Sequence, residues 1–125
     1  MTIILAYVED TEGDAAAREA VAESLRRAEP LIAVSAWRDH KLDLQRVRQH
    51  LEAIAPEAAG LDIAVVIPDL HDPSDAIIQE AQRENASLIV VGLHRRSRVG
   101  KLFLGSTAQR ILLEATCSVL AVRSG

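Results

Sequence analysis

Small, polar and basic residues cluster in one stretch that could bind an anion. Gly92 ends an apolar run, and Gly105-Ser106-Thr107 opens a segment with helical spacing. Glycine lets a backbone approach a ligand closely, and the free N–H groups at a helix start favour a phosphate. The stretch therefore predicts a phosphate or other anion site, although the GxxxxGK[ST] pattern of a Walker loop is absent.

The charges of this stretch oppose those of the rest of the chain. Its basic residues, with no acid between the first and the last, are Arg95, Arg96, Arg98, Lys101 and Arg110. Since the whole chain has a formal net charge of −4, this local reversal of sign favours an acidic ligand or partner. A solvated basic loop beside a capped helix is the plainer alternative, and both stay open.

Other residues whose side chains could bind a metal or act in catalysis have simpler explanations. The sequence Asp72-Pro73 is typical of a helix start, which accounts for an acid that might otherwise attract a cation. The four histidines and the single Cys117 form no zinc pattern, so we predict no metal. His50 lies in a helical segment and is expected at the surface. Ser106 lacks a G-x-S-x-G elbow, and we predict no catalytic residue.

Hydrophobic runs and helical patterns alternate along the chain and must position this stretch. Strands are expected at 3–8, 31–37, 61–67, 87–92 and 118–123, and helices at 13–28, 41–55, 72–85 and 106–115. Such alternation predicts one α/β domain over residues 1–125, an open, mostly parallel five-stranded sheet with helices on both faces. Ligands in such folds bind beyond the carboxyl ends of the strands, where the strand order reverses.

Composition bounds the remaining possibilities. The 125 residues suit a single domain, and with 49% hydrophobic but only 2% aromatic residues the core must be aliphatic. The acidic balance and the scarcity of aromatic residues argue against nucleic-acid binding. No basic leader and no apolar run of the roughly 20 residues that cross a bilayer is present. We therefore expect a cytoplasmic protein without membrane contact.

The spacing of the glycine-rich stretch resembles the signature of the universal stress proteins. That signature is a glycine, two residues, a second glycine, nine residues and then Gly-Ser or Gly-Thr. Here Gly92, Leu93-His94, Arg95 and Gly105-Ser106 keep the spacing in a G-x2-R-x9-G-S variant. The opening IILAYVEDTE, the run LIVVG and the closing STAQRILLEATCSVLAV are similar to the family as well. The resemblance implies a Rossmann-like fold of the adenine nucleotide alpha hydrolase type.

The resemblance also implies a function and a set of site residues. We expect a stress-response regulatory module that binds ATP, with Mg²⁺, or a related adenine nucleotide; it is not expected to be an enzyme, with slow incidental ATP hydrolysis left open. The matching positions are Tyr7, Glu9, Ala36, Val91, Gly92, His94, Arg95, Gly105, Ser106 and Thr107. Two of them depart from the family pattern: Glu9 replaces an aspartate, and Arg95 replaces the second glycine. Arg95 either blocks the pocket or supplies charged phosphate contacts.

Assembly and rival functions complete the expectations. The last strand is short and apolar, so pairing with a second copy would cover an exposed edge. The family resemblance implies a homodimer through Val119, Leu120, Ala121 and Val122. One alternative function is a nucleotide-free dimer whose basic loop contacts an acidic protein partner. Another is a small phosphate-ester enzyme that uses Glu9, and the ligand could equally be AMP or a cyclic nucleotide.

Overall fold

The computed structural model describes residues 1–35, 44–69, 72–93 and 105–124. The strands in these ranges are β1 (Thr2–Ala6), β2 (Leu31–Val34), β3 (Ile63–Val66), β4 (Ala86–Leu93) and β5 (Ser118–Arg123). The helices are α1 (Thr11–Arg27), α2 (Leu44–Ile54), α3 (Pro73–Arg83) and α4 (Ser106–Glu114), with a short 3-10 helix η1 (Pro56–Gly60) that the sequence did not predict. The order of strands and helices is the predicted one.

The five strands form one sheet in the order β3-β2-β1-β4-β5, and every pairing between neighbours is parallel. The chain builds outward from β1 to β2 and β3, then returns to place β4 on the other side of β1. The strand order therefore reverses between β1 and β4. This confirms the predicted parallel α/β architecture and identifies the reversal point, where such folds bind ligands.

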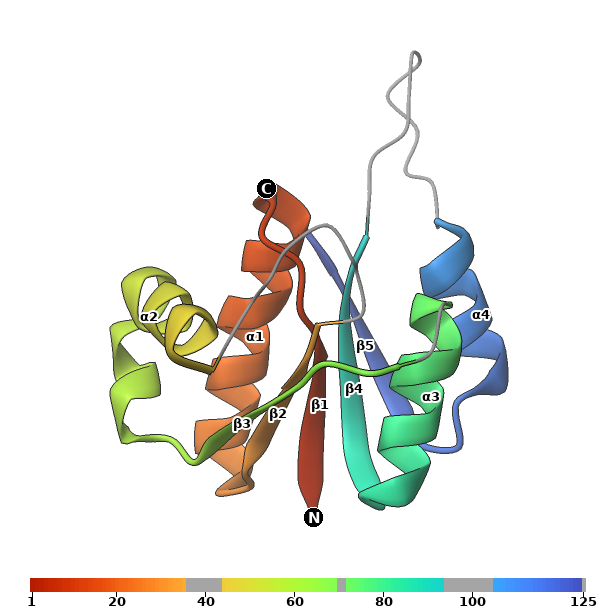
Figure 1. The fold of residues 1–125 in the computed structure, drawn as a ribbon, viewed down its shortest axis with the longest axis horizontal. Helices are drawn as coiled ribbons and strands as arrows, with labels where there is room; N and C mark the ends of the chain where they lie inside the picture. The colour runs from red at the N-terminus through yellow and green to blue at the C-terminus, as the bar shows by residue number, and fades with distance from the viewer. Residues whose placement is uncertain (36–43, 70–71, 94–104, 125) are drawn as a thin grey trace.

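Two helices cover each face of the sheet (Figure 1). α1 and α2 lie on one face, and α3 and α4 lie on the other. Alternation along β1 feeds both cores, because Ile3 and Leu5 pack toward α1 and α2 while Ile4 and Ala6 pack toward α3 and α4. Among the described residues both cores are almost wholly aliphatic, with Tyr7, which is 2% exposed, as the buried aromatic exception.

The helices begin in two different ways. Asp10 caps α1 by accepting a hydrogen bond from the Gly13 N–H at 2.6 Å, and Asp72 caps α3 in the same manner, ahead of Pro73. Gly105 precedes α4, and no side chain of the described residues caps that helix. The capped helices satisfy part of their own free donors, whereas the start of α4 leaves them to other partners.

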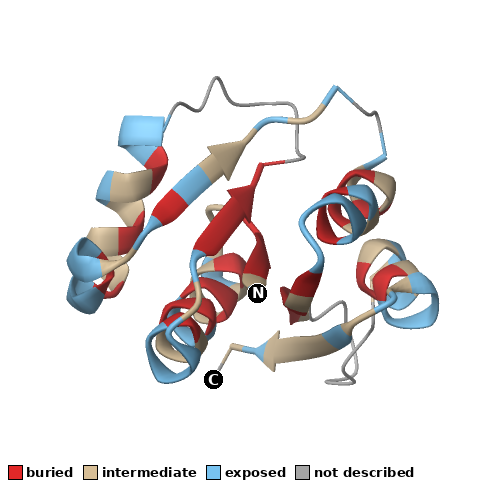
Figure 2. Cartoon of the chain, turned by 90° about the horizontal axis from the view of Figure 1, so that it is seen from below, coloured by how far each residue is buried: buried red, intermediate tan, exposed pale blue. Residues whose placement is uncertain are grey.

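Burial decreases from the centre of the sheet toward β5 (Figure 2). Residues of β1 and β2 are almost all buried, whereas the four central residues of β5 are only partly buried and its two ends are exposed. β5 pairs with β4 along one edge, and within the described chain its other edge meets no strand. β5 is thus the partly covered apolar border of the sheet.

Candidate functional site

The carboxyl ends of β1 and β4 meet the first turns of α1 and α4 at one end of the molecule (Figure 1). Of the predicted site residues, Tyr7 and Glu9 lie just after β1, and Val91 and Gly92 lie near the carboxyl end of β4. The group Gly105, Ser106 and Thr107 begins α4, while Ala36, His94 and Arg95 lie outside the described residues. The fold thus brings the predicted residues that it describes to the edge where the strand order reverses.

Glu9 is held from two sides at the end of β1. The Tyr7 hydroxyl donates a hydrogen bond to Glu9 Oε2 at 3.1 Å, and Arg46 Nη2 of α2 donates to Glu9 Oε1 at 3.3 Å. Burial acts to raise the pKa of the Glu9 carboxyl, but the bonds from Arg46 and Tyr7 outweigh it and bring that pKa below its usual value. Glu9 is therefore a fixed, ionised carboxylate.

In the hydrogen bond between Tyr7 and Glu9, the Tyr7 phenol is the buried partner. Burial is the main cause that raises the pKa of Tyr7, and the hydrogen bond to Glu9 adds to it. Arg46 acts in the opposite direction, but more weakly. Tyr7 consequently remains a neutral donor over the whole physiological pH range, which is what the ionised Glu9 needs as a partner.

A second contact joins α2 to the first turn of α1. His50 Nε2 of α2 lies 2.7 Å from Asp14 Oδ1 of α1, and the His50 ring meets the Tyr7 ring edge-on with centroids 6.0 Å apart. His50, predicted at the surface, is partly buried, with 26% of its side chain exposed. On the same helix, the side chains of Val47 and Leu51 are completely buried.

Sequence reasoning therefore missed three residues of this end of the molecule, Asp14, Arg46 and His50. A signal was present, since Arg46 and His50 are four positions apart and each directly precedes a buried residue of α2. Residues four apart share one face of a helix. What the pattern lacked was the information that this face meets the turn after β1.

Two glycines have roles in packing. A Cβ at Gly92 would lie 2.6 Å from the Glu12 carbonyl oxygen, and one at Gly13 would lie 1.9 Å from the Val8 carbonyl oxygen. Both contacts are with backbone, which rotamer changes cannot relieve. Gly92 therefore lets β4 pack closely against the first turn of α1. That it also approaches a ligand stays a prediction.

Gly105 differs from both of these glycines. Its backbone, with φ −60° and ψ 159°, suits any residue, and a Cβ there would have no atom within 4 Å among those described. Neither strain nor internal packing in the described structure requires a glycine at this position. The space next to Gly105 and the uncapped start of α4 together suit an approaching anion.

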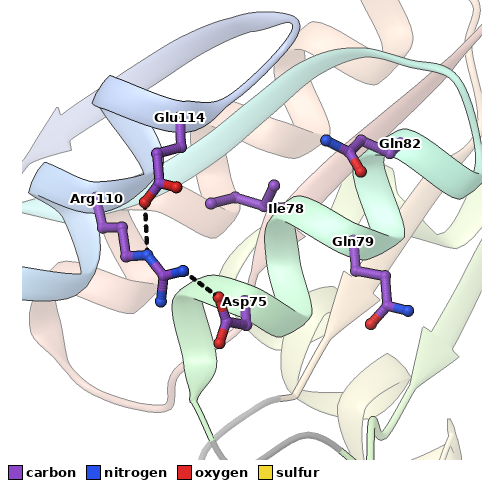
Figure 3. Close-up of a pocket in the computed structure, with 6 residues that line it drawn as sticks. All are labelled: Asp75, Ile78, Gln79, Gln82, Arg110 and Glu114. Carbon is purple, nitrogen blue, oxygen red and sulfur yellow. Dashed lines mark hydrogen bonds and ion pairs between the residues drawn. The ribbon is translucent and has the colours of Figure 1, made fainter.

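Arg110, which the sequence grouped with the basic stretch, is paired with acidic side chains of α4 and of the start of α3. Its guanidinium lies 2.6 Å from Glu114, 3.5 Å from Asp72 and in contact with Asp75. Figure 3 shows it within a groove of about 360 Å³ between α3 and α4, with Ile78, Gln79 and Gln82 on the α3 side. The acids around Arg110 neutralise it, and the spacing along the sequence did not reveal them.

No group of three or more His, Cys, Asp or Glu side chains within the described ranges is arranged to hold a metal ion. None of the helices in the described part of the chain has the length and apolar character needed to span a membrane.

The parallel sheet and the reversal of its strand order between β1 and β4 define a small α/β protein of the Rossmann-like class. The chain belongs to the universal stress protein family, whose family model matches residues 1–123. The family that the sequence resembled is thereby confirmed.

Individual relatives match over nearly the whole length. A universal stress protein of Mycolicibacterium smegmatis is 32% identical over 97% of this chain and 96% of its own, and one of Thermus aquaticus is 34% identical over 98% of each. Among solved structures, the universal stress protein of Archaeoglobus fulgidus in complex with dAMP has a TM-score of 0.70 at 17% identity, covering 97% of this chain and 95% of that one. A universal stress protein in complex with cAMP has a TM-score of 0.71 at 18% identity, covering 99% and 98%.

Proposed function

We propose that this chain binds an adenine nucleotide at the carboxyl ends of β1 and β4 and acts as a regulatory module in a stress response. The observation that carries the proposal is the uncapped start of α4 beside the space at Gly105, in a fold whose relatives were solved with dAMP and with cAMP. ATP with Mg²⁺ is our first candidate for the nucleotide, and AMP and cyclic nucleotides are the alternative candidates.

Each site residue has a proposed role. The backbone N–H groups of Ser106 and Thr107 favour the phosphates, because they lie at the positive end of the α4 dipole. Glu9 is the acceptor for the nucleoside, and Tyr7 holds it. The residues proposed to complete the site around the phosphates and the base are Ala36, Val91, Gly92, His94, Arg95 and Gly105.

A regulatory role rather than turnover agrees with the state of Glu9. Its pKa lies below the usual range, and Tyr7 and Arg46 each donate a hydrogen bond to it. A general base works best with a pKa close to the operating pH, so Glu9 is poorly suited to activate water. This argues against the phosphate-ester enzyme, and slow ATP hydrolysis would be incidental.

We further propose a homodimer through β5, in the cytoplasm. The apolar residues Val119, Leu120, Ala121 and Val122 are only partly buried in the single chain. An apolar border strand of this kind invites pairing with another strand, and a two-fold axis would cover both copies at once. Sedimentation equilibrium should give twice the chain mass, and a monomer at the highest soluble concentration would contradict the proposal.

Calorimetric titration tests the nucleotide proposal directly. Protein freed of copurified nucleotide should bind ATP with Mg²⁺ in the micromolar range, and GTP should serve as the control for base recognition. The variant Arg95→Ala decides the role of the arginine, since weaker ATP binding means that it contacts the phosphates and tighter binding means that it blocks them. Absence of heat and of thermal shift at millimolar concentrations of all adenine nucleotides would favour the nucleotide-free interaction protein.

A further inference from the structure

We propose that Arg46 of α2 and Tyr7 are positioning residues that fix the Glu9 carboxylate as the acceptor for the sugar of the bound nucleoside. This inference rests on the proposed nucleotide site, and it makes α2, through Arg46, a part of that site. It concerns how a glutamate, with one more methylene than the aspartate usual in the family, functions at this position.

A longer side chain needs additional restraint to act as a directed acceptor. A glutamate has one more rotatable bond than an aspartate, and holding it costs side-chain entropy at the moment of binding. Here each Glu9 oxygen accepts one hydrogen bond from the chain, Oε2 from Tyr7 and Oε1 from Arg46. These two bonds order Glu9 before a ligand arrives.

The two donors are themselves held in different ways. Tyr7 is 2% exposed, so its hydroxyl is a fixed point. Arg46 is exposed, with 56% of its side chain accessible, but its helix is anchored one turn later by the contact of His50 with Asp14 and by the buried Val47. Arg46 is therefore placed by α2 at the rim of the site, where a ligand can still reach Glu9.

The arrangement leaves Glu9 able to accept more. A carboxylate offers about four lone-pair positions, and the described contacts from Tyr7 and Arg46 occupy one on each oxygen. A sugar hydroxyl can thus donate to Glu9 without displacing either partner. The opposite possibility, that Arg46 blocks Glu9 and must leave, predicts the opposite sign in the experiment below.

The first measurement needs no ligand. Carbon-detected NMR titration of the Glu9 carboxyl should give a pKa that rises toward its usual value in Arg46→Ala and in Tyr7→Phe. Arg46→Lys should restore most of the lowering. Arg48→Ala is the matched control, because Arg48 pairs with Glu52 on the same helix. A Glu9 pKa unchanged in Arg46→Ala would overturn the proposed restraint.

The second measurement is calorimetric affinity for AMP and for uncharged adenosine, with folding checked by circular dichroism. Positioning predicts that Arg46→Ala and Tyr7→Phe each weaken both ligands by about tenfold, and that Arg46→Lys recovers most of the loss. Weakening of AMP alone would show a mere charge effect and overturn the positioning role. Equal or tighter adenosine binding by Arg46→Ala would overturn it in favour of a block. If the wild-type protein binds neither ligand, the nucleotide proposal fails first, and the positioning role fails with it even where the NMR result shows the restraint.

Discussion

The starts of α1 and α4 face the same end of the molecule but are built in opposite ways. At α1, Asp10 caps the helix, and Gly13 and Gly92 bring the backbones of the preceding turn and of β4 into close contact. At α4, Gly105 stands before an uncapped first turn, and no atom of the described residues lies within 4 Å of where its Cβ would be. Both starts contain glycine, but only at α1 does the protein's own packing demand it.

The comparison separates structural glycines from candidate ligand-binding ones. A glycine next to a helix start is often interpreted as room for a phosphate. At α1 that room is occupied by the carbonyl groups of Val8 and Glu12. Gly105 has no such neighbour in the described chain. Ligand binding therefore explains a glycine at this position better than packing does.

The largest effect on stability should come from adding a methyl group to a glycine packed at the start of α1. Gly13→Ala, and to a lesser degree Gly92→Ala, should lower the free energy of unfolding by more than about 3 kcal/mol, since each new methyl group meets a backbone carbonyl. Gly105→Ala should cost less than about 1 kcal/mol. Urea denaturation of the three variants measures this. Equal losses at all three positions would remove the distinction between the two helix starts.

The next largest effect is on ATP binding and concerns the start of α4 alone. Gly105→Asp should weaken ATP binding by at least about tenfold, because a carboxylate would take the place of the phosphate at the first turn of α4. The same change supplies a missing N-cap, so stability should stay equal or rise by a few tenths of a kcal/mol. Gly105→Asn, a cap without charge, is the control and should bind ATP better than the aspartate variant. Loss of both stability and binding in Gly105→Asp would mean that Gly105 is structural after all.

A moderate effect on stability is expected next to α1, where the Tyr7 hydroxyl donates a hydrogen bond to Glu9. Tyr7→Phe should cost about 1 kcal/mol at neutral pH, the value of one lost hydrogen bond. Because burial raises the pKa of Tyr7 in the folded state, its contribution is complete below about pH 10 and is lost as the pH rises beyond that value. The stability gap between wild type and Tyr7→Phe should therefore narrow above about pH 10. Urea unfolding between neutral and alkaline pH measures the gap, and a constant gap would contradict the buried phenol.

The smallest effect separates Arg110 from the open start of its own helix. Arg110→Ala should leave ATP affinity unchanged, because Asp75 and Glu114 already neutralise the guanidinium. Stability should change little as well, since ion pairs at the surface contribute weakly. Calorimetry of this variant beside Arg95→Ala gives the test. A marked loss of affinity would return Arg110 to the basic group that the sequence suggested.

The fold was largely predictable because its signals are local. The sequence Asp72-Pro73 placed the start of α3, and the uninterrupted apolar run of β4 identified a buried central strand. The short helix η1 was missed, since Pro56 to Gly60 resembles an ordinary turn in sequence. The position of the reversal between β1 and β4 also had to come from the structure.

The candidate site was predictable only where its signal is continuous in the chain. The spacing from Gly92 to Gly105 marked one half of it. The contacts of Glu9 with Arg46 join residues 37 positions apart, and no periodicity in one segment specifies such a pair. Arg110 shows the converse error, because its charge was counted without the acids that α3 brings to it.

The place of β1 between β2 and β4 has a consequence for how the chain is made. The ribosome produces β1, β2 and β3 first, and these can pair among themselves. The second edge of β1 stays open until Ala86–Leu93 has been synthesised, and contacts between segments so distant in sequence form slowly. The nascent chain thus carries an unpaired apolar strand edge until β4 has been made. Translation of β4 closes that edge and, in the same step, forms the edge of the sheet at which we propose that the nucleotide binds.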